Sequence, residues 1–166
     1  MLGQKSISRV VALHLIAILF VIFNVSNIKI AGLSSVIPLF DLMIIFYFAV
    51  FRNDFGLWFV FLMGVWSDAL TGDSLGVTAL CYVLLVKLFS ILNVKLNIKE
   101  NFGQIWKQFI IFCVVFLFTK WSLLSVMSGS LHSVNTMLIQ LVLSSVFYVV
   151  MHKFFDYLSI KLLENN

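Results

Sequence analysis

Three ionisable residues, Asp41, Asp68 and Lys120, lie within long apolar stretches of the sequence. An ionised side chain that faces lipid costs at least a few kcal/mol, so such a residue faces protein or a water-filled recess. Two aspartates on neighbouring membrane helices are the catalytic pair of one class of intramembrane protease, but Asp41 and Asp68 lack the sequence surroundings of those enzymes. The chain also has no Gly-x-Ser-x-Gly elbow, no Walker loop and no paired histidines at metal spacing. The sequence therefore indicates a protein that is not an enzyme and that holds no metal or cofactor.

The depth of these three residues suggests an ion pair. Counted at about 1.5 Å per residue from the predicted helix ends, Asp41, Asp68 and Lys120 all fall in the outer half of the bilayer. We hypothesise that Lys120 neutralises Asp68 or Asp41 and thereby fixes the helix arrangement. Two alternatives stay open: the side chains line a polar recess that receives a partner or a small ligand, or they are exposed near the lipid headgroups.

The residues around Asp68 predict a tightly packed helical hairpin. Gly64 lies four residues before Asp68 and so shares its helix face, where a glycine allows another backbone to approach closely. In the turn that follows, Gly72 is free to take a positive φ, and Ser74 is able to cap the next helix. Gly76 allows that helix to start close to its neighbour. We therefore expect Asp68 to face a packed interface.

The composition identifies the chain as an integral membrane protein. Its 166 residues are 62% hydrophobic and only 11% charged, whereas a soluble domain of this length needs far more polar surface. A membrane span takes roughly 20 residues, so the length allows at most about six helices and no sizeable soluble domain. We expect an all-α fold, a single polytopic membrane domain over residues 1–166. The apolar runs that predict its six transmembrane helices are approximately residues 10–25, 30–51, 55–70, 75–92, 105–126 and 134–155.

The second run is the least regular. Gly32, Ser34, Ser35 and Pro38 interrupt its first half. Proline lacks an amide hydrogen and clashes with the preceding turn, so we expect the regular helix to begin at Pro38. Whether residues 30–37 cross the membrane or re-enter it stays open.

The basic residues favour a topology with both termini in the cytoplasm. In that arrangement eight of the eleven lie inside, Lys87 and Lys120 lie within spans, and only Lys29 lies outside. The eight are Lys5, Arg9, Arg52, Lys95, Lys99, Lys107, Lys153 and Lys161. Such an asymmetry over short loops is the positive-inside pattern. The basic residues are scattered singly, so we expect lipid rather than nucleic acid to be their partner.

One stretch of the chain resembles a known family. The resemblance runs from Pro38 to Leu92 and rests on the residues Pro38, Asp41, Phe51, Arg52, Gly56, Gly64, Asp68, Leu70, Thr71, Gly72, Leu75, Gly76, Ala79 and Leu80. In this pattern the chain is similar to the rod shape-determining membrane protein family MreD. Outside this stretch the match is in general character only, and the segment 93–107 and Lys120 have no counterpart in the family pattern.

The resemblance implies a multi-pass protein of the bacterial inner membrane that serves the cell-elongation machinery without catalysis. It implies the scaffold protein MreC as direct partner, with the filament protein MreB, the glycosyltransferase RodA and its transpeptidase in the wider complex. The residues carried over as candidates for packing and partner docking are Pro38, Asp41, Gly64, Asp68, Gly72 and Gly76. The family also implies a fold like that of the membrane subunit of energy-coupling-factor transporters.

That fold likeness keeps a second interpretation open, in which the chain is the small-molecule-binding membrane subunit of a vitamin transporter of this type. Such a subunit needs a polar pocket. The polar inventory of the outer half is little more than Asp41, Asp68, Asn135, Gln140 and Lys120. We therefore expect no small-molecule ligand and favour the cell-shape interpretation.

Overall fold

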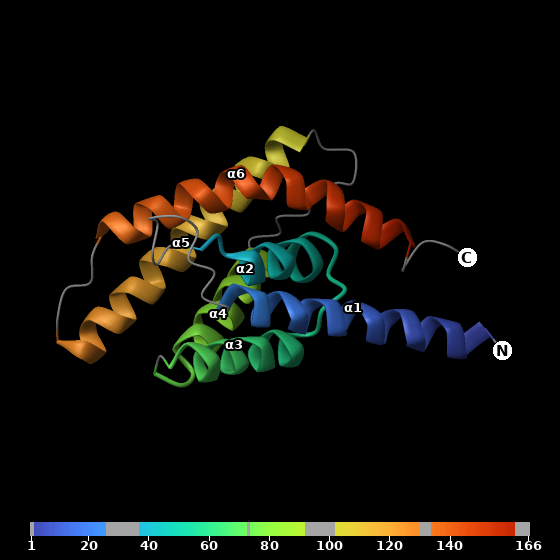
Figure 1. Ribbon diagram of the computed structural model, residues 1–166, viewed down its shortest axis with the longest axis horizontal. Helices are drawn as coiled ribbons and strands as arrows, with labels where there is room; N and C mark the ends of the chain where they lie inside the picture. The colour runs from blue at the N-terminus through green and yellow to red at the C-terminus, as the bar shows by residue number, and fades with distance from the viewer. Residues whose placement is uncertain (1, 26–36, 73, 92–101, 130–133, 162–166) are drawn as a thin grey trace.

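The computed structural model describes residues 2–25, 37–72, 74–91, 102–129 and 134–161. These residues form a helical bundle (Figure 1). The helices are α1 (Leu2–Val25), α2 (Phe40–Ile45), α3 (Leu57–Thr71), α4 (Val77–Ile91), α5 (Phe102–Ser128) and α6 (Val134–Ser159), and the π-helix η1 (Phe46–Phe51) continues α2 directly. Helix α1 begins and α6 ends at the same end of the molecule, on the right in Figure 1.

Each predicted apolar run overlaps one of these helical segments, but the ends differ from the predicted ones. The second helix begins at Phe40 rather than at Pro38, and the Phe40 amide donates to the Pro38 carbonyl at 2.9 Å. Residues 26–36, and with them the question of whether residues 30–37 span or re-enter, lie outside the described residues. Most of the lysine-rich connection after the fourth run also lies outside them.

Two of the helices are long and apolar enough to cross a membrane on their own, namely α5 and α6. The other apolar helical segments are shorter, between 10 and 17 residues. The surface of the bundle is rich in large apolar side chains, with Trp58 and Val126 each 82% exposed. Lipid covers such side chains in a membrane protein, because in water an apolar surface of this extent is a liability.

The continuous helix formed by α2 and η1 is the core of the bundle. Every residue from Asp41 to Ala49 is buried, which is possible only if other helices surround this segment. The ring of Phe46 contacts those of Phe109 and Phe112 on α5 and of Tyr148 on α6, with centroids 5.3–5.8 Å apart. The π-helical geometry ends at Arg52, whose amide donates to the Tyr47 carbonyl at 2.9 Å.

Helices α3 and α4 pack closely as a hairpin, and a glycine makes this possible. A Cβ atom added to Gly64 would lie 2.3 Å from the Cα and 2.6 Å from the backbone nitrogen of Ala79. The two backbones therefore touch at this point, as small residues allow in membrane helix pairs. The hairpin brings the last turn of α3 beside the first turn of α4, and we call this end of the bundle the hairpin end.

Candidate functional site

The carboxylate of Asp68 joins the two helices of the hairpin. It is fully buried near the end of α3, and its Oδ2 accepts a hydrogen bond from the Gly76 amide at 2.8 Å. The Thr78 amide, in the first turn of α4, lies 3.1 Å from Oδ2 and 3.2 Å from Oδ1. The first amides of a helix lack partners within it, and a negative charge there is favoured by the helix dipole. Asp68 thus caps α4 from the neighbouring helix.

The turn before α4 has the backbone that its glycines allow. Gly72 ends α3 with a φ of 74°, and its amide donates to the Asp68 carbonyl at 3.0 Å. Gly76 has a φ of 95°, in the region that side chains with a Cβ rarely adopt. Ser74 contributes its carbonyl, which accepts from the Val77 amide at 3.3 Å. The side-chain cap of α4 is therefore supplied by Asp68 rather than by Ser74.

Asp41 fixes the start of the central helix to α4. Its side chain is 2% exposed; Oδ2 accepts from the Tyr82 hydroxyl at 2.5 Å and Oδ1 from the Leu42 amide at 2.8 Å. The Tyr82 ring in turn stacks on that of Phe116 in α5, with centroids 5.2 Å apart. Tyr82 thus binds the carboxylate of α2 and packs against α5 at the same time.

Helix α6 holds the segment just before α2. The Gln140 side-chain amide donates to the Ile37 carbonyl at 3.2 Å, and the Leu39 amide donates to the Ser144 hydroxyl at 3.0 Å. These bonds satisfy backbone groups that the Pro38 interruption leaves outside a regular helix. Gln140 and Ser144 are four residues apart and so lie on one face of α6.

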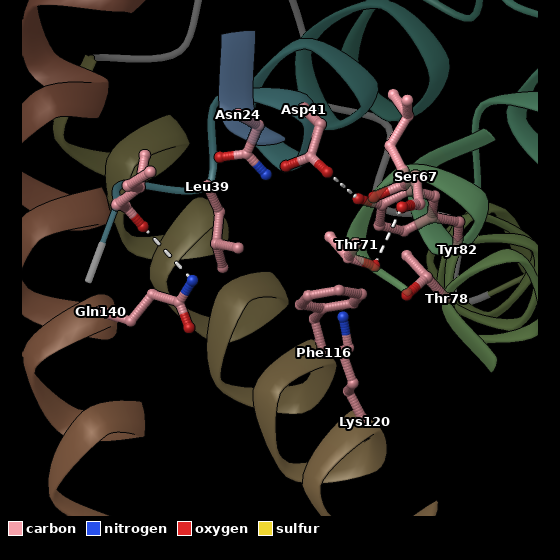
Figure 2. Close-up of a pocket in the computed structure, with 12 residues that line it drawn as sticks. Asn24, Leu39, Asp41, Ser67, Thr71, Thr78, Tyr82, Phe116, Lys120 and Gln140 are labelled. Atoms are coloured by element: carbon pink, nitrogen blue, oxygen red, sulfur yellow. Dashed lines mark hydrogen bonds between the residues drawn. The ribbon is translucent and has the colours of Figure 1, made fainter. Parts of the chain in front are cut away.

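A cavity of about 280 Å³ lies among these residues at the hairpin end (Figure 2). Helices α1 to α6 all contribute to its wall, together with the segment before α2. The lining residues are Asn24, Ile37, Leu39, Asp41, Ser67, Leu70, Thr71, Thr78, Tyr82, Phe116, Lys120 and Gln140. Figure 2 shows the Lys120 side chain extending from α5 into this space, with its nitrogen beside the Phe116 ring. The wall is thus mostly polar although the surrounding bundle is apolar.

Thr78 carries an unsatisfied group in this wall. Its side chain is 1% exposed, and its Oγ1 has no hydrogen-bond partner among the described residues. A buried hydroxyl without a partner costs about 1–3 kcal/mol. Such groups are rare in native proteins and point to an unseen partner such as water, an ion or a ligand. The cavity is therefore a site with unmet hydrogen-bonding capacity.

The structure distributes the residues singled out from the sequence over two places. Asp41 and Lys120 line the same cavity, and Pro38 lies in the segment that leads into it. Gly64, Asp68, Gly72 and Gly76 build the hairpin beside it. The Asp68 carboxylate accepts from the backbone amides of Gly76 and Thr78, and Thr78 also lines the cavity. The pairing of Lys120 with an aspartate stays a prediction, with Asp41 the candidate that shares its cavity.

Several lining residues were not anticipated as site residues, above all Thr78 and Tyr82. They are four residues apart on α4, so a polar face on an otherwise apolar helix was the available signal. Gln140 and Ser144 give the same four-residue signal on α6. Their hydrogen-bond partners, however, are backbone groups that the sequence does not mark.

The fold and the cavity define a class: a helical protein with an apolar surface of the kind that lipid covers and with a polar cavity at one end. The chain matches the family model of the rod shape-determining protein MreD over residues 4–158, and it belongs to that family. This family consists of membrane proteins that act in rod shape determination with MreB and MreC, and it is not a known enzyme family. No curated protein and no solved structure gives a significant match to the chain.

Proposed function

We propose that this protein is a non-catalytic, multi-pass subunit of the bacterial inner membrane that binds the scaffold protein MreC. Through this contact it helps to couple MreB filaments in the cytoplasm to peptidoglycan synthesis by RodA and its transpeptidase. Membership of the MreD family supports the role in cell shape. The cavity at the hairpin end is the observation that supports binding of a partner there.

The cavity has the properties of a docking site rather than of a completed core. Its wall combines the carboxyl group of Asp41 and the amino group of Lys120 with a Thr78 hydroxyl that has no partner among the described residues. Leu70, which also lines it, is 42% exposed, so the cavity reaches the surface of the bundle. A partner segment that enters can supply the missing hydrogen bonds, which an isolated bundle cannot.

The expected topology places the cavity on the side of the membrane where the proposed partner lies. Asn24 lies next to the last residue of α1 and Gln140 near the start of α6, so the cavity lies away from the end where α1 begins and α6 ends (Figure 1). With both termini in the cytoplasm, as the basic residues favour, the cavity opens on the periplasmic side. MreC is a periplasmic scaffold, so its segment nearest the membrane is the part that can reach this site.

A second candidate function, a vitamin-binding subunit of an energy-coupling-factor transporter, also gains an observation from the cavity. Its volume of about 280 Å³ is near the lower limit of small-molecule pockets, which begin at about 300 Å³. A transporter subunit of this kind needs an energising pair of ATPases, whereas a shape protein needs a scaffold and wall enzymes. The identity of the bound proteins therefore separates the two functions.

The test is affinity purification after crosslinking in a rod-shaped host, with two tryptophan variants of α3. Leu70→Trp places a bulky ring at the cavity, and Leu62→Trp places one at a site on the same helix that is 59% exposed. We expect the wild type and Leu62→Trp to recover MreC, and Leu70→Trp to lose it. When the native protein is depleted, we expect cells that carry only Leu70→Trp to become round. Recovery of an ATPase pair without wall proteins, or rods that persist on depletion, would contradict the proposal.

A further inference from the structure

A second cavity, of about 300 Å³, adjoins the polar one. It lies between the second half of α5 and the first half of α6, which cross at an angle in Figure 1. Four residues belong to both walls, namely Leu39, Phe116, Lys120 and Gln140. The residues that line the second cavity alone are Leu117, Trp121, Leu124, Thr136 and Met137. The two spaces are thus neighbouring compartments, one mostly polar and one mostly apolar.

The polar compartment suits an anion. Asp41 lies in the same wall, and its two oxygens accept from the Tyr82 hydroxyl and the Leu42 amide. Lys120 brings a cationic group into the space, and Figure 2 shows its side chain pointing toward Thr71. The hydroxyl of Thr78 adds a donor that has no partner among the described residues. An ammonium with hydroxyl donors nearby is a common way to bind phosphate oxygens.

The apolar compartment suits a hydrocarbon chain. A small water-soluble anion would fill the polar space and leave the pocket beside Leu117, Leu124 and Met137 empty. Apolar surface in contact with water is unfavourable by about 25 cal/mol per Å². A molecule with an anionic head and an apolar tail fills both compartments at once, and Lys120 lies on the wall that they share.

We propose that the paired cavities bind one anionic membrane phospholipid, its phosphate beside Lys120 and Thr78 and one acyl chain between α5 and α6. This inference goes beyond the contact with MreC and does not depend on it. A partner segment that enters the polar compartment displaces the lipid head, so lipid and partner compete for the same space. The lipid then keeps the cavity filled whenever no partner is docked.

The head of the lipid is tested by two variants and a matched control, each purified in mild detergent and analysed for retained lipid by native mass spectrometry. Lys120→Met removes the charge but keeps a long side chain, and Thr78→Val removes only the hydroxyl. Lys87→Met is the control, because Lys87 is exposed on α4 and lines neither cavity. We expect wild type and control to retain anionic phospholipid, and the affinity to fall about tenfold in Lys120→Met and severalfold in Thr78→Val. Equal retention by all four proteins would overturn the proposal.

The tail is tested separately by filling the apolar compartment. Met137→Trp inserts a ring into that pocket, whereas Leu138→Trp places the ring at the neighbouring position, which is 53% exposed. We expect only Met137→Trp to lose the lipid. Inorganic phosphate is tested in parallel on delipidated protein: binding of free phosphate that depends on Lys120, without lipid retention that depends on Met137, would show a site for a soluble anion and overturn the lipid assignment. Capture of MreC, measured on the same variants, reports independently on the proposed function.

Discussion

Replacing Asp68 tests whether one carboxylate fastens the α3–α4 hairpin. In Asp68→Ala, the amides of Gly76 and Thr78 lose the acceptor that lies 2.8–3.2 Å away. A buried amide without a partner costs about 1–3 kcal/mol, and loss of a helix cap costs about 0.5–2 kcal/mol. The two costs are not added, because both describe the loss of the acceptor for the same two amides. Because the turn at Gly76 is only partly buried and its amide can find water, we expect a total of about 2–3 kcal/mol.

The conservative variant refines this prediction. Asp68→Asn keeps one acceptor oxygen, and Oδ2 alone lies within 3.1 Å of both amides. The hydrogen bonds then lose only the assistance of the charge, which roughly doubles their strength. We therefore expect a loss of about 1 kcal/mol, so that stability decreases in the order wild type, asparagine, alanine.

The assay uses the two cysteines, Cys81 on α4 and Cys113 on α5, which are both fully buried. A fluorogenic maleimide reacts with them only when the bundle opens, so heating in detergent reports unfolding. For a chain of this size, 2–3 kcal/mol corresponds to a shift of roughly 4–12 °C. Asp54→Ala is the control: Asp54 pairs with Arg52 at 3.3 Å on the surface, where such pairs contribute about 0–1 kcal/mol. Equal melting of Asp68→Ala and Asp54→Ala would refute the role of Asp68 as a cap.

Three further predictions use the same melting assay. In Gly64→Ala the new Cβ meets the Ala79 backbone at 2.3 Å, so the helices must move apart at a cost of about 1–3 kcal/mol; melting equal to wild type would contradict the close approach. In Tyr82→Phe the buried Asp41 loses a donor while the aromatic stacking remains, and we expect a loss of about 1–3 kcal/mol. In delipidated Thr78→Val a buried hydroxyl without a partner among the described residues is replaced by a methyl group, so we expect stability to rise, by up to about 1–3 kcal/mol; a large loss would mean that the hydroxyl has a protein partner.

The helices were largely predictable because apolar runs in a membrane protein correspond to helices. Their ends were less predictable, since hydropathy marks the apolar stretch and not the last hydrogen bond. Helix α6 runs to Ser159, beyond the apolar run that ends at 155, because polar and charged residues there continue the helix. The π-helix over Phe46–Phe51 had no signal, since its aromatic and apolar residues fit a regular helix equally well.

The sequence allowed the charged residues of the candidate site to be predicted, but not the groups to which its side chains form hydrogen bonds. The sequence marked Asp68 as a carboxylate that needs compensation and suggested Lys120, because lysine is the visible opposite charge. The structure shows the backbone amides of Gly76 and Thr78 donating to Asp68, and such donors carry no mark in the sequence; the pairing with Lys120 stays a prediction. The same holds for the Gln140 amide, whose acceptor is the Ile37 carbonyl. Which polar side chains share a cavity depends on the tertiary packing of six helices.

The central claim is that the cavity at the hairpin end receives a segment of MreC, and site-specific photo-crosslinking in living cells tests it most directly. A photoreactive amino acid of leucine size replaces either Leu70, which lines the cavity, or Leu62, which lies on the same helix outside it. We predict a crosslink to MreC from position 70 that is absent from position 62. An MreC crosslink from position 62 alone, or from neither position, would contradict the account.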